Sequence, residues 1–92
     1  LYWREYAGFL IKMGLYDEAC QVLDEAEDHT YGSDLIYCRA IIAYLQKQKA
    51  DCLEFLEEAL VENYDQHHIL FEIAPELKLD KEINSMIKYF AD

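Results

Sequence analysis

The sequence predicts an all-α fold of about six helices in a single domain of 92 residues. Apolar residues recur every three or four positions along nearly the whole chain, which is the spacing of an amphipathic helix. No segment alternates apolar and polar residues for long enough to indicate a strand. Only three glycines and one proline interrupt the pattern, so the chain is neither disordered nor of low complexity.

Each expected helix carries its own apolar run. In chain order, the residues that show the spacing or supply the apolar stretch are Trp3, Tyr6, Ala7 and Leu10; Tyr16, Ala19, Cys20, Leu23 and Ala26; the stretch 35–46; Cys52, Leu53, Leu56, Ala59 and Leu60; Ile69, Leu70, Phe71 and Ile73; and Ile83, Met86, Ile87 and Phe90. The helices are therefore expected over residues 1–13, 16–29, 33–46, 49–62, 65–74 and 80–91.

The breaks between the runs set the expected helix ends. The first helix ends before Gly14, because a glycine just beyond the last turn readily adopts the left-handed capping conformation. Ser33, Asp65 and Asp80 stand where a side-chain oxygen can cap the third, fifth and sixth helices, and Pro75 stops the fifth. The connections are short, so consecutive helices must pack antiparallel.

Charge and hydropathy restrict the partners. Nineteen acidic residues outnumber eight basic ones, which gives a net charge of −11. Nucleic acid and anionic lipid surfaces both require basic residues, so neither is predicted as a partner. A basic or neutral protein surface is easier to accommodate. No stretch approaches 18 apolar residues, so no membrane insertion is predicted.

Cysteine usage and the first residue bear on localisation. Cys20, Cys38 and Cys52 form an odd set without a CxxC motif, which argues against a disulfide framework and favours a reducing compartment. A cytoplasmic protein is therefore predicted. Leu1 is neither an initiator methionine nor the start of a signal peptide, so we expect the chain to be a segment of a longer protein.

An internal repeat appears when the chain is overlaid on itself at an offset of 33 residues. Small residues then coincide at positions 19 and 52 and at 26 and 59, and apolar residues coincide at 20/53, 22/55 and 23/56. A repeat of this length built from two helices is typical of an α-solenoid, in which each unit buries its apolar face against its neighbours.

The first of these units carries a recognisable pattern in Trp3, Tyr6, Ala7, Leu10, Gly14-Leu15-Tyr16-Asp17-Glu18-Ala19, Leu23 and Ala26. This pattern resembles a tetratricopeptide repeat (TPR), in which the usual order of residue types is aromatic, large, small, large, G-x-Y-x-x-A, large and alanine. The second unit is degenerate, because Lys47-Gln48-Lys49 replaces Gly-x-Tyr, Arg39 occupies a usually apolar position and Cys52 replaces an alanine. The resemblance implies repeats over residues 1–32 and 33–64 and capping helices over 65–92.

Residue size supports close helix crossings independently of the family. A larger side chain at a crossing would force the helix axes apart and cost ~1–3 kcal/mol. The small residues expected at the crossings are Ala7, Ala19, Ala26, Ala40, Cys52 and Ala59. The large residues expected to fill the space between them are Trp3, Tyr6, Leu10, Leu23, Leu53 and Leu56.

The TPR resemblance implies a non-catalytic scaffold or adaptor, in which the first helix of each pair lines a concave face that binds a protein or peptide. Gly8 stands where a repeat that clamps a C-terminal carboxylate needs an asparagine, so that subtype is excluded. The residues implied for the binding face are Arg4, Gly8, Ile11, Lys12, Tyr37, Ile41, Tyr44 and Leu45.

Two alternatives to this binding face stay open. In the first, Tyr37, Ile41 and Tyr44 simply pack beneath the capping helices. In the second, the chain is purely structural: it completes a longer solenoid, or it associates with itself through its aromatic N-terminal end.

No catalytic residue, cofactor or metal site is predicted. The three cysteines lie on packed faces without a histidine partner, and no glycine-rich phosphate loop or Ser-His-Asp order is present. Asp65, His68 and Glu72 share one face of a helix, which leaves a metal site as a minor alternative. The many carboxylates of the second helices are expected to form a solvated convex face.

Overall fold

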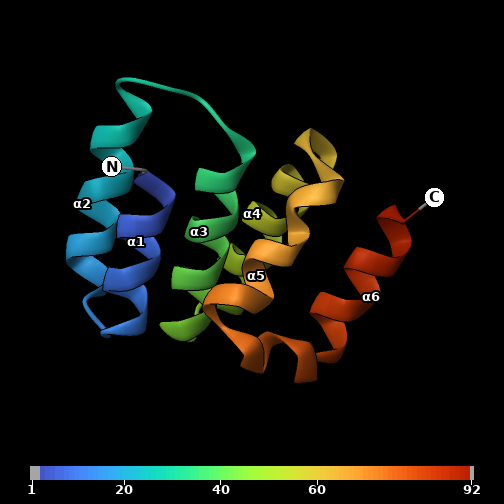
Figure 1. The fold of residues 1–92 in the computed structure, drawn as a ribbon. Coiled ribbons are helices and arrows are strands. Elements are labelled where there is room, and N and C mark those ends of the chain that lie inside the picture. The colour runs from blue at the N-terminus through green and yellow to red at the C-terminus, as the bar shows by residue number, and fades with distance from the viewer. Residues whose placement is uncertain (1–2, 92) are drawn as a thin grey trace.

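The computed structural model describes residues 3–91, and within them the chain forms α-helices and short 3₁₀ helices without any strand (Figure 1). The predicted all-α fold with six α-helices is therefore confirmed. The predicted positions at residues 1, 2 and 92 lie outside the described residues. The elements are α1 (Trp3–Lys12), α2 (Tyr16–Glu27), α3 (Ser33–Leu45), α4 (Lys49–Glu62), η1 (Tyr64–His67), α5 (His68–Ile73), η2 (Pro75–Leu79) and α6 (Lys81–Phe90).

The helices pack as two hairpins followed by a C-terminal segment (Figure 1). Helix α1 packs on α2, and α3 packs on α4. The first helices of the two hairpins, α1 and α3, also contact each other, and α5 continues this layer by contacting both of them. Helix α6 packs on α4 and η2, so it lies at the opposite end of the molecule from the α1–α2 hairpin (Figure 1).

Two of the predicted caps are observed. Gly14 has φ +79°, the left-handed conformation that terminates α1. The side chain of Asp80 caps α6, because its carboxylate accepts a hydrogen bond of 3.0 Å from the backbone N–H of Ile83.

At the other predicted helix ends, the structure differs from the prediction. Ser33 is the first residue of α3 rather than its cap, and its hydroxyl donates to the side-chain oxygen of Gln66. Asp65 lies within η1, where no side-chain cap is made. Pro75 follows α5 as expected but also begins η2, a 3₁₀ helix that was not predicted. Proline suits the first helical position, because its fixed φ is helical and its missing N–H has no intrahelical acceptor there.

The core follows the predicted pattern of small residues at the crossings. Five alanines and Cys52, at positions 7, 19, 26, 40, 52 and 59, are at most 1% exposed. Leu23 and Leu56 are fully buried, and Leu10 is nearly so. Tyr6 departs from the prediction: its side chain is 40% exposed, because no described helix packs on that side of α1.

Candidate functional site

Three of the predicted binding residues line one hollow between α1 and α5. Arg4, Gly8 and Lys12 are spaced four residues apart and therefore lie along one side of α1. The hollow has a volume of about 350 Å³. Its remaining lining residues, which the sequence did not single out for this site, are Glu5 and Phe9 of α1 and Ile69, Glu72 and Ile73 of α5.

The other predicted residues lie mostly beneath α5 instead of on the surface. Ile11, Tyr37 and Ile41 are at most 2% exposed. The hydroxyl of Tyr37 donates a hydrogen bond of 2.8 Å to the backbone carbonyl of Asn63. Burial raises the pKa of Tyr37 to about 12. Their burial leaves none of these three side chains accessible at the surface, which agrees with the packing alternative for Tyr37 and Ile41.

Tyr44 lies at the other end of α3 and is half-buried, as is its neighbour Leu45. The ammonium group of Lys49 is 5.7 Å from the centre of the Tyr44 ring. Burial raises the pKa of the Tyr44 hydroxyl, and the nearby Asp80 carboxylate adds to the shift. Tyr44 therefore belongs to a polar cluster at the start of α4 and α6, away from the hollow beside α1.

Gly8 allows the close approach of α1 and α5. A Cβ atom at this position would lie 3.3 Å from Cδ1 of Ile73, which is tighter than ordinary packing. Helices α1 and α5 are far apart in the sequence. Their close approach at Gly8 completes the layer formed by α1, α3 and α5. The lack of a side chain at Gly8 also shapes the floor of the hollow.

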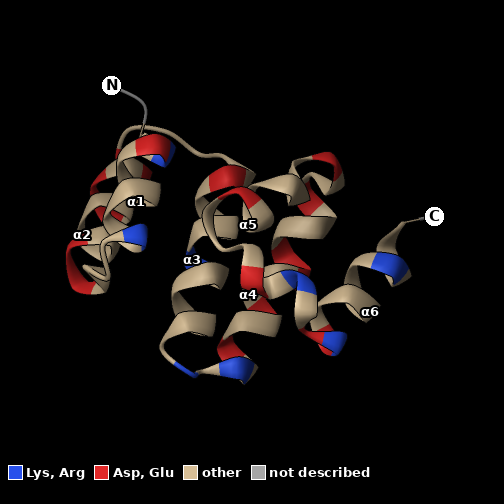
Figure 2. Cartoon of the chain, turned by 60° about the horizontal axis from the view of Figure 1, so that its bottom comes forward, with Lys and Arg blue, Asp and Glu red and all other residues tan. Residues whose placement is uncertain are grey.

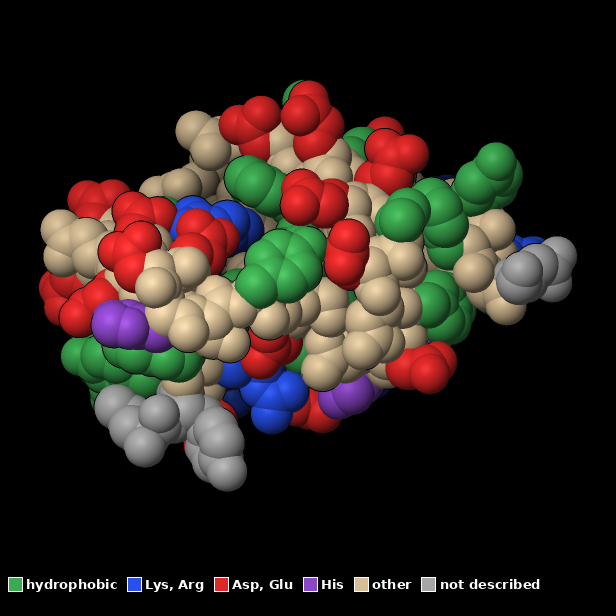
Figure 3. Space-filling view, turned by 90° about the horizontal axis from the view of Figure 1, so that it is seen from above, with side chains coloured by type: hydrophobic (Ala, Val, Ile, Leu, Met, Phe, Trp, Pro, Cys, Tyr) green, Lys and Arg blue, Asp and Glu red, His purple; other side chains and the backbone are tan. Residues whose placement is uncertain are grey.

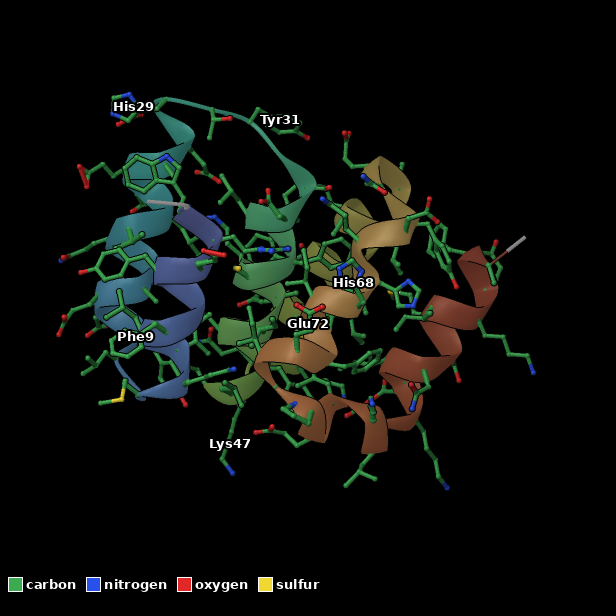
Figure 4. The ribbon with its side chains drawn as sticks, in the orientation of Figure 1. Phe9, His29, Tyr31, Lys47, His68 and Glu72 are labelled. Atoms are coloured by element: carbon green, nitrogen blue, oxygen red, sulfur yellow. The ribbon has the colours of Figure 1, made fainter. Side chains whose placement is uncertain are left out.

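A second hollow adjoins the first at the start of α1. It has a volume of about 540 Å³ and lies between α1, the 28–32 connection and the first turn of α3. Arg4 and Glu5 line both hollows, so the two adjoin along α1, and we call them together the path. The ring of Trp3 stacks on His29 at 5.9 Å, and Tyr31, which is 68% exposed, projects from the connection (Figure 4).

The charges on this path are mixed, whereas most of the surface is acidic. Figure 3 shows acidic side chains across the visible face with few basic ones among them, and Figure 2 shows the same excess on α2 and α4. Among the described residues, Arg4 and Lys12 form no ion pair. Glu5, Asp34 and Glu72 supply the negative charges of the path. The path can therefore offer charged groups of both signs to a partner.

Arg39, which breaks the TPR pattern, has a structural role. Its guanidinium group lies 2.7 Å from Asp24 and 2.9 Å from Glu27, so it joins α2 to α3. The hydrogen bond to Glu27 is the main cause of a raised pKa of Arg39. Three charge-assisted hydrogen bonds hold the planar group in place. Arg39 is thus occupied in joining the two hairpins.

The thiols and histidines show no reactive arrangement in the described part of the chain. Burial raises the pKa of Cys38 to about 12 and that of Cys52 to about 11, so both stay protonated at neutral pH. Nε2 of His68 lies 3.6 Å from the Glu72 carboxylate. No group of three or more His, Cys, Asp or Glu residues among residues 3–91 is arranged to hold a metal ion.

None of the helices within residues 3–91 combines the length and the apolar character needed to cross a lipid bilayer. Comparisons with protein-family models, with curated proteins and with solved structures found no match to this chain. The TPR assignment therefore stays a prediction from the sequence.

Sequence reasoning missed the α5 side of the hollow, because helical spacing does not reveal which distant helix packs beside α1. The sequence did contain an indication that Phe9 lies at this hollow. Phe9 is a large apolar residue at a position of α1 that the core does not use, and its side chain is 57% exposed. Tyr31 gave a similar signal, as an aromatic residue within a polar turn.

Proposed function

We propose that the protein is a non-catalytic protein–protein interaction module of the TPR type, which presents the inner surface of its first helices to a peptide or protein partner. The observation that supports this most directly is the path of two adjoining hollows along α1, which meet at Arg4 and Glu5. A surface formed by packed helices changes little on binding, which lowers the ordering cost.

The chemistry of the path defines the partner segment we propose. Trp3, Tyr31 and Phe9 offer aromatic surface along the path, and aromatic residues and arginine are frequent binding hot spots. Arg4 and Lys12 favour an acidic group on the segment that lies against them. The net charge of −11 acts at longer range and favours a partner whose remaining surface is basic. We propose the cytoplasm as the location of the protein, because its three cysteines are free and its surface is strongly acidic.

The proposal is tested by selecting random displayed peptides against the immobilised protein and measuring their affinities. We expect selected peptides that combine an apolar side chain with an acidic one. The double substitution Arg4→Gln/Lys12→Gln should weaken their binding about tenfold or more, since a charge-assisted contact contributes about 1.5–3 kcal/mol. Lys88→Gln, an exposed lysine of α6, is the matched control and should leave affinity unchanged.

Backbone amide shifts in an NMR titration locate the contact. Perturbations along α1, the 28–32 connection and α5 support the proposal. Selected peptides that perturb α4 and α6 instead, or that bind the double variant as tightly as the original chain, contradict it.

A purely structural function is the second candidate, and one observation favours it. Tyr6, Phe9 and Met13 are exposed apolar residues on α1, where a further helical unit or another molecule could pack.

A further inference from the structure

An apolar groove lies between α4 and α6, at the opposite end of the molecule from the α1–α2 hairpin. It has a volume of about 510 Å³ and shares no lining residue with the two hollows of the path. Its apolar lining residues are Leu53 of α4 and Met86, Tyr89 and Phe90 of α6. We call this surface the C-terminal groove.

Tyr89 is the most exposed of these apolar residues. It is 80% exposed, and its ring lies 5.2 Å from that of Phe90 in an edge-to-face arrangement. Leu53, Met86 and Phe90 are half-buried and pack against the core, so they form a firm floor beside it. An open groove between helices, with an exposed aromatic side chain on one wall, suits the apolar face of an amphipathic helix.

The α4 wall of the groove is acidic. Glu57 lines the groove one helical turn after Leu53 and is exposed. Glu54 lies three residues before Glu57 and extends the same side of α4 toward solvent. Neither glutamate forms an ion pair among the described residues, because Lys49, the one basic residue of α4, pairs with the start of α6.

The α6 wall carries more basic than acidic residues. Lys81 lines the groove, is exposed and forms no ion pair within residues 3–91. Ser85 and Lys88 follow it along the same side of α6. Glu82 also lines the groove, but its carboxylate is held by Lys49 at 2.9 Å. The two walls therefore differ in the sign of their free charges (Figure 2).

We propose that the C-terminal groove binds an amphipathic helix of a partner protein, with basic residues along one flank of its apolar face and acidic residues along the other. The apolar face fills the groove against Leu53 and Tyr89. The basic flank lies against Glu57 of α4, and the acidic flank lies against Lys81 of α6. This inference does not depend on the path along α1.

Charge complementarity selects this occupant. A helix with flanks of a single sign would meet one wall of like charge, and like charges at an interface oppose association. Unlike flanks also fix the direction of the bound helix. Reversing the helix with its apolar face still in the groove would place each flank against the wall of its own sign.

The test measures the binding of three synthetic peptides to the full chain by fluorescence anisotropy. Each peptide is an amphipathic helix of about 18 residues with the same leucine face, long enough to be helical in water. The first has lysines on one flank and glutamates on the other, the second has lysines on both, and the third has glutamates on both. At moderate salt, which screens the net charge of −11, the first should bind most tightly and shift the backbone amide signals of α4 and α6.

The aromatic wall is tested by Tyr89→Ala. This variant should bind the first peptide about tenfold more weakly, because aromatic residues are frequent binding hot spots. Tyr89 is mainly exposed, so the helical circular dichroism spectrum should be unchanged. Met13→Ala, a change of an exposed apolar residue just after α1, is the matched control and should bind the first peptide like the original chain.

The charged walls are tested by Glu57→Lys, which makes the α4 wall basic like the α6 wall. The first peptide should then bind about threefold more weakly or worse, and the third peptide should become the tightest binder. Glu25→Lys, at an exposed position of α2, makes the same change in net charge away from the groove. It is the control and should leave the order of the three peptides unchanged.

Four results would each overturn the proposal. The first is that the mixed-charge peptide does not bind, or shifts no signal of α4 or α6. The second is that a peptide with flanks of one sign binds the original chain most tightly. The third is that Glu57→Lys leaves the order of the peptides unchanged. The fourth is that the original chain associates with itself and Tyr89→Ala does not, which would make a second copy the occupant.

Discussion

At the scale of single residues, Tyr37 decides between a binding role and a packing role for the middle of α3. Its side chain is fully buried, and its hydroxyl donates to the carbonyl of Asn63 at the end of α4. That carbonyl also accepts a hydrogen bond from the backbone N–H of Gln66, at 3.3 Å. Tyr37 therefore joins α3 to the segment where α4 ends and η1 begins.

Two substitutions separate the roles of the ring and the hydroxyl of Tyr37. Tyr37→Ala should lower the free energy of unfolding by about 3–5 kcal/mol, because a buried aromatic side chain is lost and a cavity remains. Tyr37→Phe should lower it by only about 1 kcal/mol, because the Asn63 carbonyl keeps its bond from Gln66. Urea unfolding followed by circular dichroism measures both values.

The dependence of the free energy of unfolding on alkaline pH provides a further check on Tyr37. The folded pKa is raised from 10.0 to about 12, so its contribution is complete below pH 10 and is lost as the pH rises toward 12. Tyr37→Phe should lack this loss. A Tyr37→Ala variant with nearly unchanged stability would show that the ring is accessible, and would restore it to the binding surface.

Residue spacing also explains which site residues were predictable. Arg4, Gly8 and Lys12 lie along one side of α1 and line one hollow, which follows from local helical geometry alone. For Tyr37 and Ile41 the sequence left two readings open, a binding face or packing beneath the capping helices; both side chains are buried, and α5 packs on α3. Their burial depends on the return of α5 across α1 and α3, which is a long-range contact that no local spacing encodes.

At the scale of elements, hydrogen bonds and ion pairs at the first turn of α6 hold this helix in place. The Asp80 carboxylate accepts from the backbone N–H of Ile83 and lies 2.6 Å from Nζ of Lys49. Lys49 also contacts Glu82 at 2.9 Å, so the start of α4 is tied to the start of α6. The hydrogen bonds to Asp80 and Glu82 raise the pKa of Lys49, so it stays charged.

Acid should weaken the contacts of Asp80 over a defined range of pH. Burial of Asp80 opposes its ionisation, but hydrogen bonds from Lys49 and from the Ile83 N–H outweigh burial, and its pKa lies below 3.8. The contribution of Asp80 to stability is therefore complete above pH 3.8 and is lost as the pH falls through the lower folded pKa. Urea unfolding at a series of acidic pH values measures this loss.

Two variants of Asp80 distinguish the cap from the charge. Asp80→Ala should lower the free energy of unfolding by about 1 kcal/mol or more at neutral pH, because α6 loses its cap. Asp80→Asn keeps a capping oxygen, so it should lose less, and it should also lack the part of the acid dependence that Asp80 causes. An Asp80→Asn protein with the acid profile of the original chain would show that other carboxylates set it.

The elements themselves were largely predictable, and the exceptions have a common cause. Strong periodicity predicted the six α-helices, and local chemistry predicted the Gly14 and Asp80 caps. The 3₁₀ helices were missed, and Ser33 and Asp65 were wrongly expected to be caps. These features lie where the chain meets distant segments, as in the contact between Ser33 and Gln66, so tertiary contacts override the local preference.

At the scale of the whole molecule, the net charge of −11 works against the compact state. The attractive ion pairs of the described residues are concentrated around Arg39 and Lys49, with one weaker contact between His68 and Glu72. Helix α4 shows the imbalance most clearly, because Glu54, Glu58 and Glu62 repeat every four residues and like charges at this spacing repel.

Screening should therefore stabilise this protein. Adding neutral salt weakens both the repulsion and the ion pairs, but repulsion involves many more charges, so the free energy of unfolding should rise with salt concentration. Urea unfolding at low and at moderate salt measures the change, and sodium and potassium chloride should give the same result because no specific ion is required. A fall in stability with salt would show that the Arg39 and Lys49 ion pairs outweigh the repulsion.

A single substitution on α4 tests the same balance directly. Glu58→Lys replaces two repulsive pairs, with Glu54 and Glu62, by two attractive ones, and each change of sign contributes about 0.4–1 kcal/mol. The variant should be about 1 kcal/mol more stable at low salt and should respond less to added salt. Glu58→Gln, which removes repulsion without adding attraction, should fall between the two. Equal salt responses in all three proteins would mean that repulsion along α4 is not what limits stability.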